Sequence, residues 1–258
     1  MRMQFTFKRF TFRMAAIAVL CAMAIAPAVT HAQSAYSEDF TGAVSNNPWY
    51  FYNGACLTAG TSTVTTTPNV VPSCMTVKSI YYNEHLTGGF NGTNGASETL
   101  PDPVGNGALR LTNGYITPGS GGYNQNGAIV SAGSPFDAGA GVQITFKTVT
   151  YRGDSGGAGG DGADGISFFL VDGATDLSAY SGVGAFGGSL GYTCSNANND
   201  PTLRPDGTPR GYDGLVGAYI GLGIDEYGNF LNPGDNTASG PGYVPNRIGL
   251  RGRGNISW

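Results

Sequence analysis

After residue 33 the chain is a succession of short apolar runs, each bounded by Gly, Pro, Asn or Asp. Residues 108–112 and 142–149 alternate apolar and polar side chains, the period of a strand with one face in solvent. Residues 166–171 and 215–224 are apolar almost throughout, as expected of strands covered on both faces. No segment after residue 33 keeps a helical period over three turns. These patterns predict an all-β fold, a two-sheet antiparallel sandwich of the jelly-roll kind. The sandwich is expected to have long loops at one end, and three long loops stand out in the sequence: residues 53–79, 152–163 and 192–213.

Residues 1–32 have the pattern of a secretory signal peptide. Four basic residues precede the apolar run 14–29, and the small residues Thr30 and Ala32 offer a cleavage site. The run is too short, and has the wrong flanks, for a membrane span. The mature protein is therefore expected to span residues 33–258 as one domain, to be secreted, periplasmic or at the cell surface, and to have no membrane span.

The mature chain is acidic. Four of the 13 Lys and Arg residues lie in the signal segment, which leaves nine against 17 Asp and Glu, about −8 in all. Nucleic acid is therefore not an expected partner, because phosphate binding requires a basic face. The one basic cluster, formed by Arg247, Arg251 and Arg253, is expected to lie in solvent along a strand edge.

Three cysteines remain after signal removal. In an oxidising compartment, Cys56 and Cys74 are expected to pair, because both lie in a Ser/Thr/Pro/Asn-rich loop that a crosslink would tether. Cys194 either pairs with a cysteine outside this sequence, stays free, or packs under a loop. His85 is the only histidine left, which argues against a Cys/His metal site and against a histidine-based hydrolase.

The run 223–230 carries oxygen-bearing side chains at alternate positions. In a strand, Asp225, Tyr227 and Asn229 would share one face. Carboxylate, amide and backbone carbonyl oxygens are the ligands that calcium prefers. Asp235 is the nearest further carboxylate. The alternative is that Asp225 and Asn229 only cap a turn.

Three segments in this order, residues 162–170, 187–191 and 223–230, resemble the sugar-binding loops of the L-type (legume-type) lectins, including their bacterial relatives. The similarity extends over most of the mature chain, from residues 38–40 through 107–113 to 247–250. It implies a concanavalin-like sandwich over residues 33–258 and a non-enzymatic, calcium-dependent function in glycan or polysaccharide binding, such as adhesion. These domains continue for several strands after the segment matching 247–250. The sequence is therefore expected to be a fragment or to form an incomplete sandwich.

The resemblance implies a calcium site. In L-type lectins this strand ends in an Asp, an aromatic residue whose carbonyl binds calcium, and an Asn that bridges calcium and sugar. These map onto Asp225, Tyr227 and Asn229, and the remaining carboxylate maps onto Asp235, with Asn232 as a competitor.

The same resemblance implies that the second metal site of these lectins is missing. A Glu and a His that bind a transition metal in the family are replaced by Gly223 and Arg247. Calcium is therefore expected without a companion manganese ion.

The other sugar contacts implied by the resemblance lie at Asp164, Gly188 and Tyr227. Asp164 matches an Asp that accepts hydrogen bonds from sugar hydroxyls and follows a cis peptide bond, here Ala163–Asp164. Gly188 matches a glycine whose backbone N–H reaches the sugar, and the Tyr227 ring is the candidate for stacking on the sugar.

Two alternatives come from other classes of protein. Some glycoside hydrolases share the sandwich, but the chemistry requires two carboxyl groups flanking one bond, and the adjacent Asp225 and Glu226 would face opposite sides of a strand. The second alternative is a structural module of a surface adhesin or pilus that no longer binds sugar. Membership of a larger adhesin, or of an oligomer, is compatible with either binding or structural roles.

Overall fold

The chain forms a mostly β structure of small antiparallel sheets. The computed structural model describes these residues: 2–6, 36–63, 70–76, 100–112, 125–139, 141–150, 164–177, 183–203, 209–233 and 239–253. Within them lie eleven strands, the 3-10 turn η2 (Gly187–Ser189), and no α-helix. None of the described helices has the length and hydrophobicity that crossing a membrane requires. The predicted β class is therefore confirmed, and the arrangement as a two-sheet sandwich stays a prediction.

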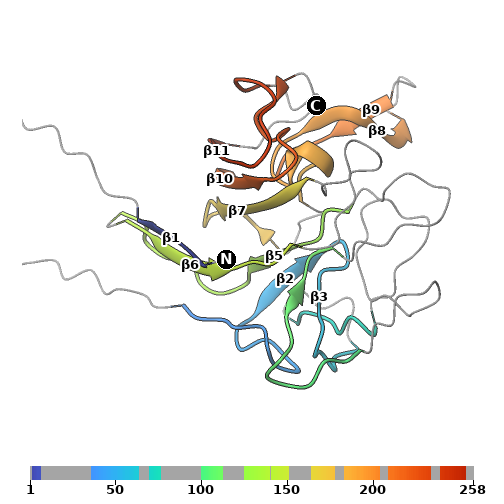
Figure 1. Cartoon of the computed structure of the whole chain (residues 1–258), viewed down its shortest axis with the longest axis vertical. Helices are drawn as coiled ribbons and strands as arrows, with labels where there is room; N and C mark the ends of the chain where they lie inside the picture. The colour runs from blue at the N-terminus through green and yellow to red at the C-terminus, as the bar shows by residue number, and fades with distance from the viewer. Residues whose placement is uncertain are drawn as a thin grey trace, which may run out of the picture. The chain divides into compact units, whose positions relative to one another are not determined.

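The chain divides into two compact units, one made of Met1–Ser37 and Pro135–Val149 and the other of Glu38–Ser134 and Thr150–Trp258. In the first unit, β1 (Arg2–Thr6) pairs antiparallel with β6 (Gln143–Lys147) (Figure 1). β6 alternates exposed and half-buried residues, as its sequence pattern predicts for a strand with one wet face. β1 lies inside the segment expected to be removed as a signal peptide, and both that removal and the single domain over 33–258 stay predictions.

The second unit contains the sheet that positions the candidate site. Its order is β11 (Arg247–Arg251), β10 (Ala218–Asp225), β7 (Gly165–Val171), all antiparallel (Figure 1). Ile224 lies opposite Ile166 on β7 and Ile248 on β11. The two apolar runs predicted as strands are thus neighbours in one sheet. β7 is half-buried along its whole length, so the expectation that it is covered on both faces is only partly met.

One face of this sheet packs on aromatic rings. A Cβ atom at Gly221 would lie 2.7 Å from the Tyr192 ring, and one at Gly223 would lie 2.4 Å from the Phe230 ring. Tyr192 and Phe230 are fully buried and form a core cluster with Leu215 and Ala218. Glycine is therefore required in β10 because the rings occupy the space of its side chains.

A second ribbon pairs β2 (Trp49–Tyr52) with β5 (Ala128–Ser131). Tyr52, Ala128 and Val130 form its buried cluster, and Phe169 of β7 packs against both this cluster and the Tyr192 cluster. The core of the second unit is therefore continuous from the ribbon to the three-stranded sheet.

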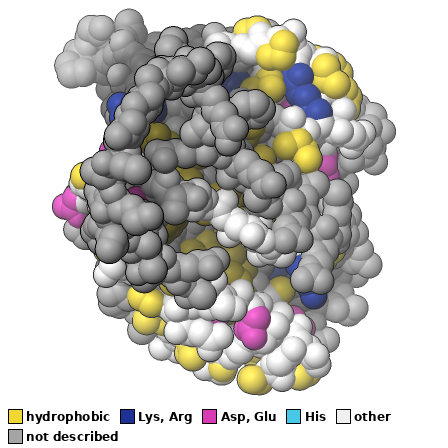
Figure 2. All heavy atoms as spheres, turned by 90° about the vertical axis from the view of Figure 1, so that its left-hand side faces the viewer, with side chains coloured by type: hydrophobic (Ala, Val, Ile, Leu, Met, Phe, Trp, Pro, Cys, Tyr) yellow, Lys and Arg dark blue, Asp and Glu magenta, His cyan; other side chains and the backbone are white. Residues whose placement is uncertain are grey.

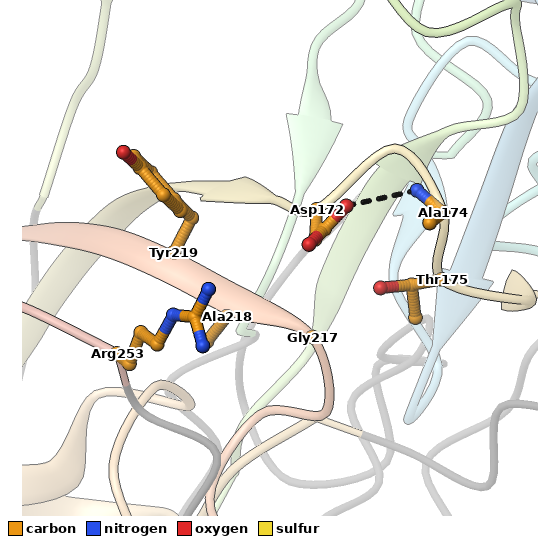
Figure 3. A pocket seen from close by; sticks show the side chains of 7 residues that line it. All are labelled: Asp172, Ala174, Thr175, Gly217, Ala218, Tyr219 and Arg253. Carbon is orange, nitrogen blue, oxygen red and sulfur yellow. Dashed lines mark hydrogen bonds between the residues drawn. The ribbon is translucent and has the colours of Figure 1, made fainter.

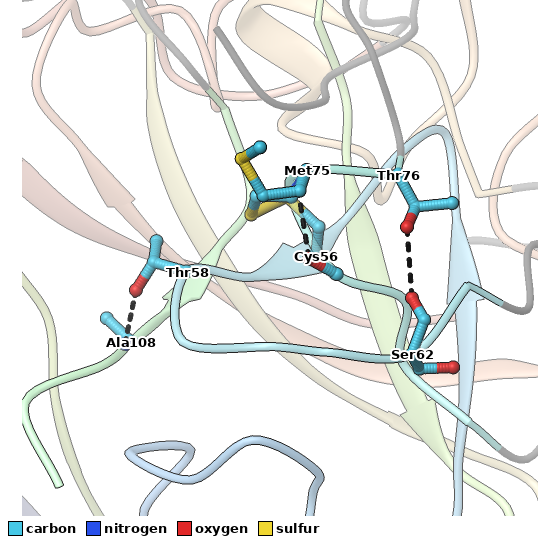
Figure 4. Close-up of a disulfide and its surroundings, with 8 residues drawn as sticks. Cys56, Thr58, Ser62, Met75, Thr76 and Ala108 are labelled. Atoms are coloured by element: carbon cyan, nitrogen blue, oxygen red, sulfur yellow. Dashed lines mark hydrogen bonds between the residues drawn. A yellow bond between two sulfur atoms is a disulfide. The ribbon is translucent and has the colours of Figure 1, made fainter. Parts of the chain in front are cut away.

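The disulfide Cys56–Cys74 is present and confirms the predicted pairing (Figure 4). Cys56 lies in β3 (Cys56–Leu57), which pairs with β4 (Leu109–Arg110). Around the bridge, the N–H of Ala108 donates to Thr58 Oγ1 at 2.8 Å, and Thr76 Oγ1 donates to the Ser62 carbonyl at 3.1 Å. A bridge of this kind is typical of a protein that folds outside the reducing cytosol.

The predicted loop over residues 192–213 is wrong for part of its length. β8 (Ser195–Leu203) and β9 (Pro209–Tyr212) form an antiparallel ribbon with two register shifts. The sequence of β8 is polar and rich in Asn, so it lacks the apolar alternation that identifies a half-buried strand. Backbone pairing needs no such alternation, and the pattern therefore missed it.

Candidate functional site

The turn that follows β10 is organised by the carboxylate of Asp225. This side chain is buried, with 1 % of the residue exposed. Its Oδ1 accepts a hydrogen bond from the N–H of Gly228 at 2.7 Å, and its Oδ2 accepts one from the N–H of Phe230 at 2.8 Å. Because hydrogen bonds to an ionised group are short and strong, Asp225 fixes the path of residues 226–230. Asp225 therefore caps the turn, as one of the two alternatives from the sequence had it for Asp225 and Asn229.

Gly228 is essential to the same turn. Its φ is +107°, a conformation that residues with a side chain rarely adopt. A Cβ atom there would also lie 2.5 Å from Pro245 N and from the carbonyl carbon of Val244. The turn after β10 and the chain at 244–245 therefore touch through backbone alone.

Strand alternation does not bring Asp225, Tyr227 and Asn229 together. β10 ends at Asp225, so Tyr227 and Asn229 belong to the turn and the prediction that they share a strand face is wrong. The physical reason is the pair of N–H groups that bend back onto the Asp225 carboxylate and end the strand. All three residues nevertheless lie within one five-residue stretch of a fixed turn.

Asp164 lies directly against this turn. The antiparallel register pairs Asp225 with Gly165, the first residue of β7. The carbonyl oxygen of Asp164 accepts hydrogen bonds from Glu226 N at 3.0 Å and from Tyr227 N at 3.2 Å. Two hydrogen bonds therefore join the backbone of Asp164 to the turn, although Asp164 and the turn are some sixty positions apart in the sequence.

The third predicted segment reaches the same place. Asp164 Oδ2 lies 4.0 Å from the position that a Cβ atom of Gly187 would take, at the start of η2. Ser167 of β7 donates its hydroxyl to the carbonyl of Leu190, at the end of η2, at 2.7 Å. Gly188, the middle residue of η2, is buried. The segments carrying Asp164, Gly188 and Tyr227 thus converge at the end of β10 and the start of β7.

Asn229 is buried, with 9 % exposed, and is held by Asn232. Its Oδ1 accepts from Asn232 Nδ2 at 2.8 Å, and its carbonyl accepts from Asn232 N at 2.9 Å. Asn232, the competitor to Asp235 in the sequence prediction, therefore lies beside the site. Asp235 itself and the Ala163–Asp164 peptide bond fall outside the described residues.

An aromatic pair flanks the turn. The rings of Tyr227 and Tyr243 lie with centroids 5.7 Å apart in an edge-to-face arrangement, and Tyr243 is 53 % exposed. Asn246 N donates to the Glu226 carbonyl at 3.0 Å, and Val244 N donates to the Gly228 carbonyl at 3.1 Å, which holds the second ring beside the first. Sequence patterns did not indicate Tyr243, because its distance along the chain hides the return of this loop to the turn.

Two arginines of β11 support the turn. Arg247 Nε lies 3.7 Å from Asp225 Oδ2, and Arg247 Nη2 donates to the Gly242 carbonyl at 2.7 Å. Arg251 Nε donates to the Phe230 carbonyl at 2.7 Å, and burial lowers the pKa of Arg251 from its ordinary value. The prediction that these arginines only solvate a strand edge is wrong for Arg247 and Arg251. Their guanidinium groups turn inward and donate to carbonyls of the turn and its neighbouring loop.

The oxygen atoms at the turn are of the types that calcium binds. Each oxygen of Asp225 accepts one N–H and keeps a second lone pair, and the turn adds the carbonyl of Tyr227 and the amide oxygen of Asn229. Among the residues that the structure describes, no group of three or more His, Cys, Asp and Glu is arranged to hold a metal ion. Calcium would therefore depend on carbonyl and amide oxygens together with Asp235. The Arg247 guanidinium beside Asp225 Oδ2 repels any cation at this carboxylate, so a calcium ion there would need the other oxygens to compensate.

Glu226 points to a different partner from Asp225. Its Oε1 accepts a hydrogen bond from the hydroxyl of Thr150, whereas the Asp225 carboxylate is buried in the turn. The two neighbouring carboxylates therefore have separate surroundings.

A small cavity of about 210 Å³ lies at the end of the sheet away from the candidate site, where β7 ends and β10 begins (Figure 3). Figure 3 shows Tyr219 and Arg253 on one side of it and Asp172 and Thr175 on the other. None of the predicted site residues lines it. On the face shown in Figure 2, charged side chains of the described residues are scattered singly or in small groups among hydrophobic and uncharged atoms.

No protein-family model, curated protein or solved structure matches this chain. The similarity to L-type lectins therefore stays an inference from the motifs themselves.

Proposed function

We propose that this chain is an exported carbohydrate-binding protein of the L-type lectin kind, whose sheets belong to a concanavalin-like sandwich. The observation that carries the proposal is the convergence of three separated segments at one sheet end. Asp164 bonds through its backbone to Glu226 and Tyr227, and its carboxylate faces the start of η2. These are the segments that the sequence singled out for sugar binding.

Each group at this sheet end offers a distinct contact to a sugar. The carboxylate of Asp164 accepts hydrogen bonds from hydroxyl groups, and the bare backbone at Gly188 permits close approach. Asn229 offers an amide that both donates and accepts. The Tyr227 and Tyr243 rings offer an apolar surface for the C–H face of a sugar ring.

In this proposal Asp225, Tyr227, Asn229 and Asp235 hold one calcium ion, which supplies fixed positive charge that orients the amide of Asn229. Asp225 keeps its role as the cap of the turn. The Asp164 carbonyl ties the turn to β7 independently of the ion. Loss of calcium is therefore expected to weaken glycan binding without unfolding the sheet.

The leader-like residues 1–32 and the Cys56–Cys74 bridge support export to the periplasm, the cell surface or the medium. At that location the proposed role is adhesion or surface glycan recognition, as a domain of a larger adhesin or in an oligomer.

The test is a glycan array probed with residues 33–258 in calcium and in EDTA. The wild type is expected to bind a restricted set of glycans in calcium only. Asp164→Asn is expected to lose that binding while it stays folded. The matched control is Asp172→Asn, which changes an exposed carboxylate at the other end of β7.

Three results would contradict the proposal. The first is no glycan binding by a folded, calcium-loaded wild type, which would favour the structural-module alternative. The second is unchanged binding by Asp164→Asn. The third is release of reducing sugar from polysaccharides, abolished by changing a carboxylate, which would favour the hydrolase alternative.

A further inference from the structure

β11 carries two arginines, four residues apart, that both reach the loop after β10. Arg247 lies opposite Asp225 in the β10–β11 register. Its guanidinium lies beside the Asp225 carboxylate, with Nε 3.7 Å from Oδ2, while Nη2 bonds the Gly242 carbonyl at 2.7 Å and the Gly228 carbonyl at 3.5 Å. One side chain thus connects the end of β10, the turn and the chain that returns at 242.

Arg251 makes a similar connection between the end of the turn and the returning chain. Its Nε donates to the Phe230 carbonyl at 2.7 Å, and its guanidinium carbon lies 5.3 Å from the centre of the Phe230 ring. Its Nη2 donates to the Ser239 carbonyl at 2.6 Å, and its Nη1 donates to Ser239 Oγ at 3.1 Å. The end of the turn is therefore joined to residue 239.

Together the two guanidinium groups join the outgoing and the returning segments of the loop that carries the candidate site. The turn supplies Asp225, Gly228 and Phe230, and the returning chain supplies Ser239 and Gly242. Arginine suits this role because its planar fork of five N–H donors reaches several carbonyls at once, which the single ammonium of lysine does not. Burial strengthens the contacts of Arg247, which exposes only 15 % of its side chain, whereas the contacts of Arg251 with Ser239 are exposed.

We propose that Arg247 and Arg251 are positioning residues that hold Tyr227 and Asn229 in the binding arrangement, whether or not a metal ion is bound. The inference rests on the proposed carbohydrate function for its biological meaning. Its structural content is separate: the loop is fixed by side chains of the neighbouring strand. The buried charge of Asp225 is balanced by Arg247 and two N–H groups. A calcium ion then adds to a loop that is already formed.

The experiment compares backbone hydrogen exchange of the purified protein, in EDTA and with calcium chloride alone, for the wild type and for Arg247→Gln, Arg251→Gln and Arg253→Gln. In the wild type, amides of residues 226–232 are expected to be protected equally in both conditions. Arg247→Gln and Arg251→Gln should speed exchange there about tenfold, the equivalent of one hydrogen bond to a charged group. Arg253→Gln, which changes an exposed arginine outside the loop, is the control.

Amides of β2 and β5 provide the internal reference, because a general loss of stability would speed their exchange as well. Arg247→Lys keeps the charge near Asp225 but lacks the planar fork of donors. Its turn amides are therefore expected to exchange as fast as those of Arg247→Gln. On the glycan array, both glutamine variants should lose most of the wild-type signal, and Arg253→Gln should keep it.

Protection of residues 226–232 that appears only with calcium would overturn the inference, and so would unchanged exchange in both glutamine variants. Wild-type array signal in Arg247→Gln would overturn the positioning role. A wild type that binds no glycan removes the proposed function instead, while the exchange comparison still decides whether the arginines hold the loop.

Discussion

Replacing Asp225 with Asn is the sharpest test of how the turn is held. The substitution keeps the size of the side chain and exchanges one acceptor oxygen for an NH₂ donor. In the structure both oxygens accept backbone N–H groups, from Gly228 at 2.7 Å and from Phe230 at 2.8 Å. One of these N–H groups must then face a donor, and the Arg247 guanidinium loses its anionic neighbour.

The expected loss follows from these contacts. A hydrogen bond to a charged group contributes about 1.5–3 kcal/mol, and a buried donor left without an acceptor costs about 1–3 kcal/mol. Arg247 keeps its bond to the Gly242 carbonyl, so the ion pair adds little beyond this. We therefore expect Asp225→Asn to lower the free energy of unfolding by about 2–3 kcal/mol.

Equilibrium unfolding in urea, followed by far-UV circular dichroism, measures this change. The measurement is made in EDTA and again in calcium, because a cap contributes in both and a pure metal ligand contributes only in calcium. Asp172→Asn is the control, since this residue is exposed, its Oδ1 accepts from Ala174 N, and an amide oxygen can replace that acceptor. A loss below about 0.5 kcal/mol in EDTA, the size of an ordinary surface substitution, would refute the capping role.

Two further predictions concern the core and the pH dependence of stability. Gly223→Ala places a Cβ atom 2.4 Å from the Phe230 ring, so it should lower the free energy of unfolding by about 1–3 kcal/mol in urea, and a neutral effect would show that the ring is free to move away. Burial raises the pKa of Glu38, but hydrogen bonds from neighbouring N–H groups lower it more, so the folded-state pKa lies below the ordinary value of 4.5. The stabilisation from Glu38 is then present above pH 4.5 and is lost as pH falls through the folded-state value. Thermal unfolding between neutral and acid pH should therefore show a smaller acid destabilisation in Glu38→Gln than in the wild type, and an equal one would contradict this assignment.

The strands β7 and β10 of the central sheet could be predicted because each is a continuous apolar run in the sequence. Residues 166–171 lie within β7, and residues 218–224 of the predicted run 215–224 lie within β10. The pairing of Cys56 with Cys74 was also predictable, because export and a shared polar loop leave few alternatives. The sequence did not indicate the β8–β9 ribbon, whose pairing is made by backbone groups.

The candidate site was predictable in its residues and less so in its geometry. Asp225, Asp164 and Gly188 were identified from motifs, and they lie in segments that meet. The strand alternation expected for Tyr227 and Asn229 failed because a carboxylate that accepts two N–H groups ends the strand. The roles of Arg247 and Tyr243 depend on which loop returns to the turn, and that is a property of the tertiary structure.

A crystal structure of residues 33–258, soaked with calcium and the strongest array glycan, tests the central claim most directly. The account predicts a sugar that contacts the Asp164 carboxylate, the backbone at Gly188 and the Asn229 amide, with one ion beside Asp225. A sugar bound elsewhere, such as in the cavity between Asp172 and Arg253, would contradict it.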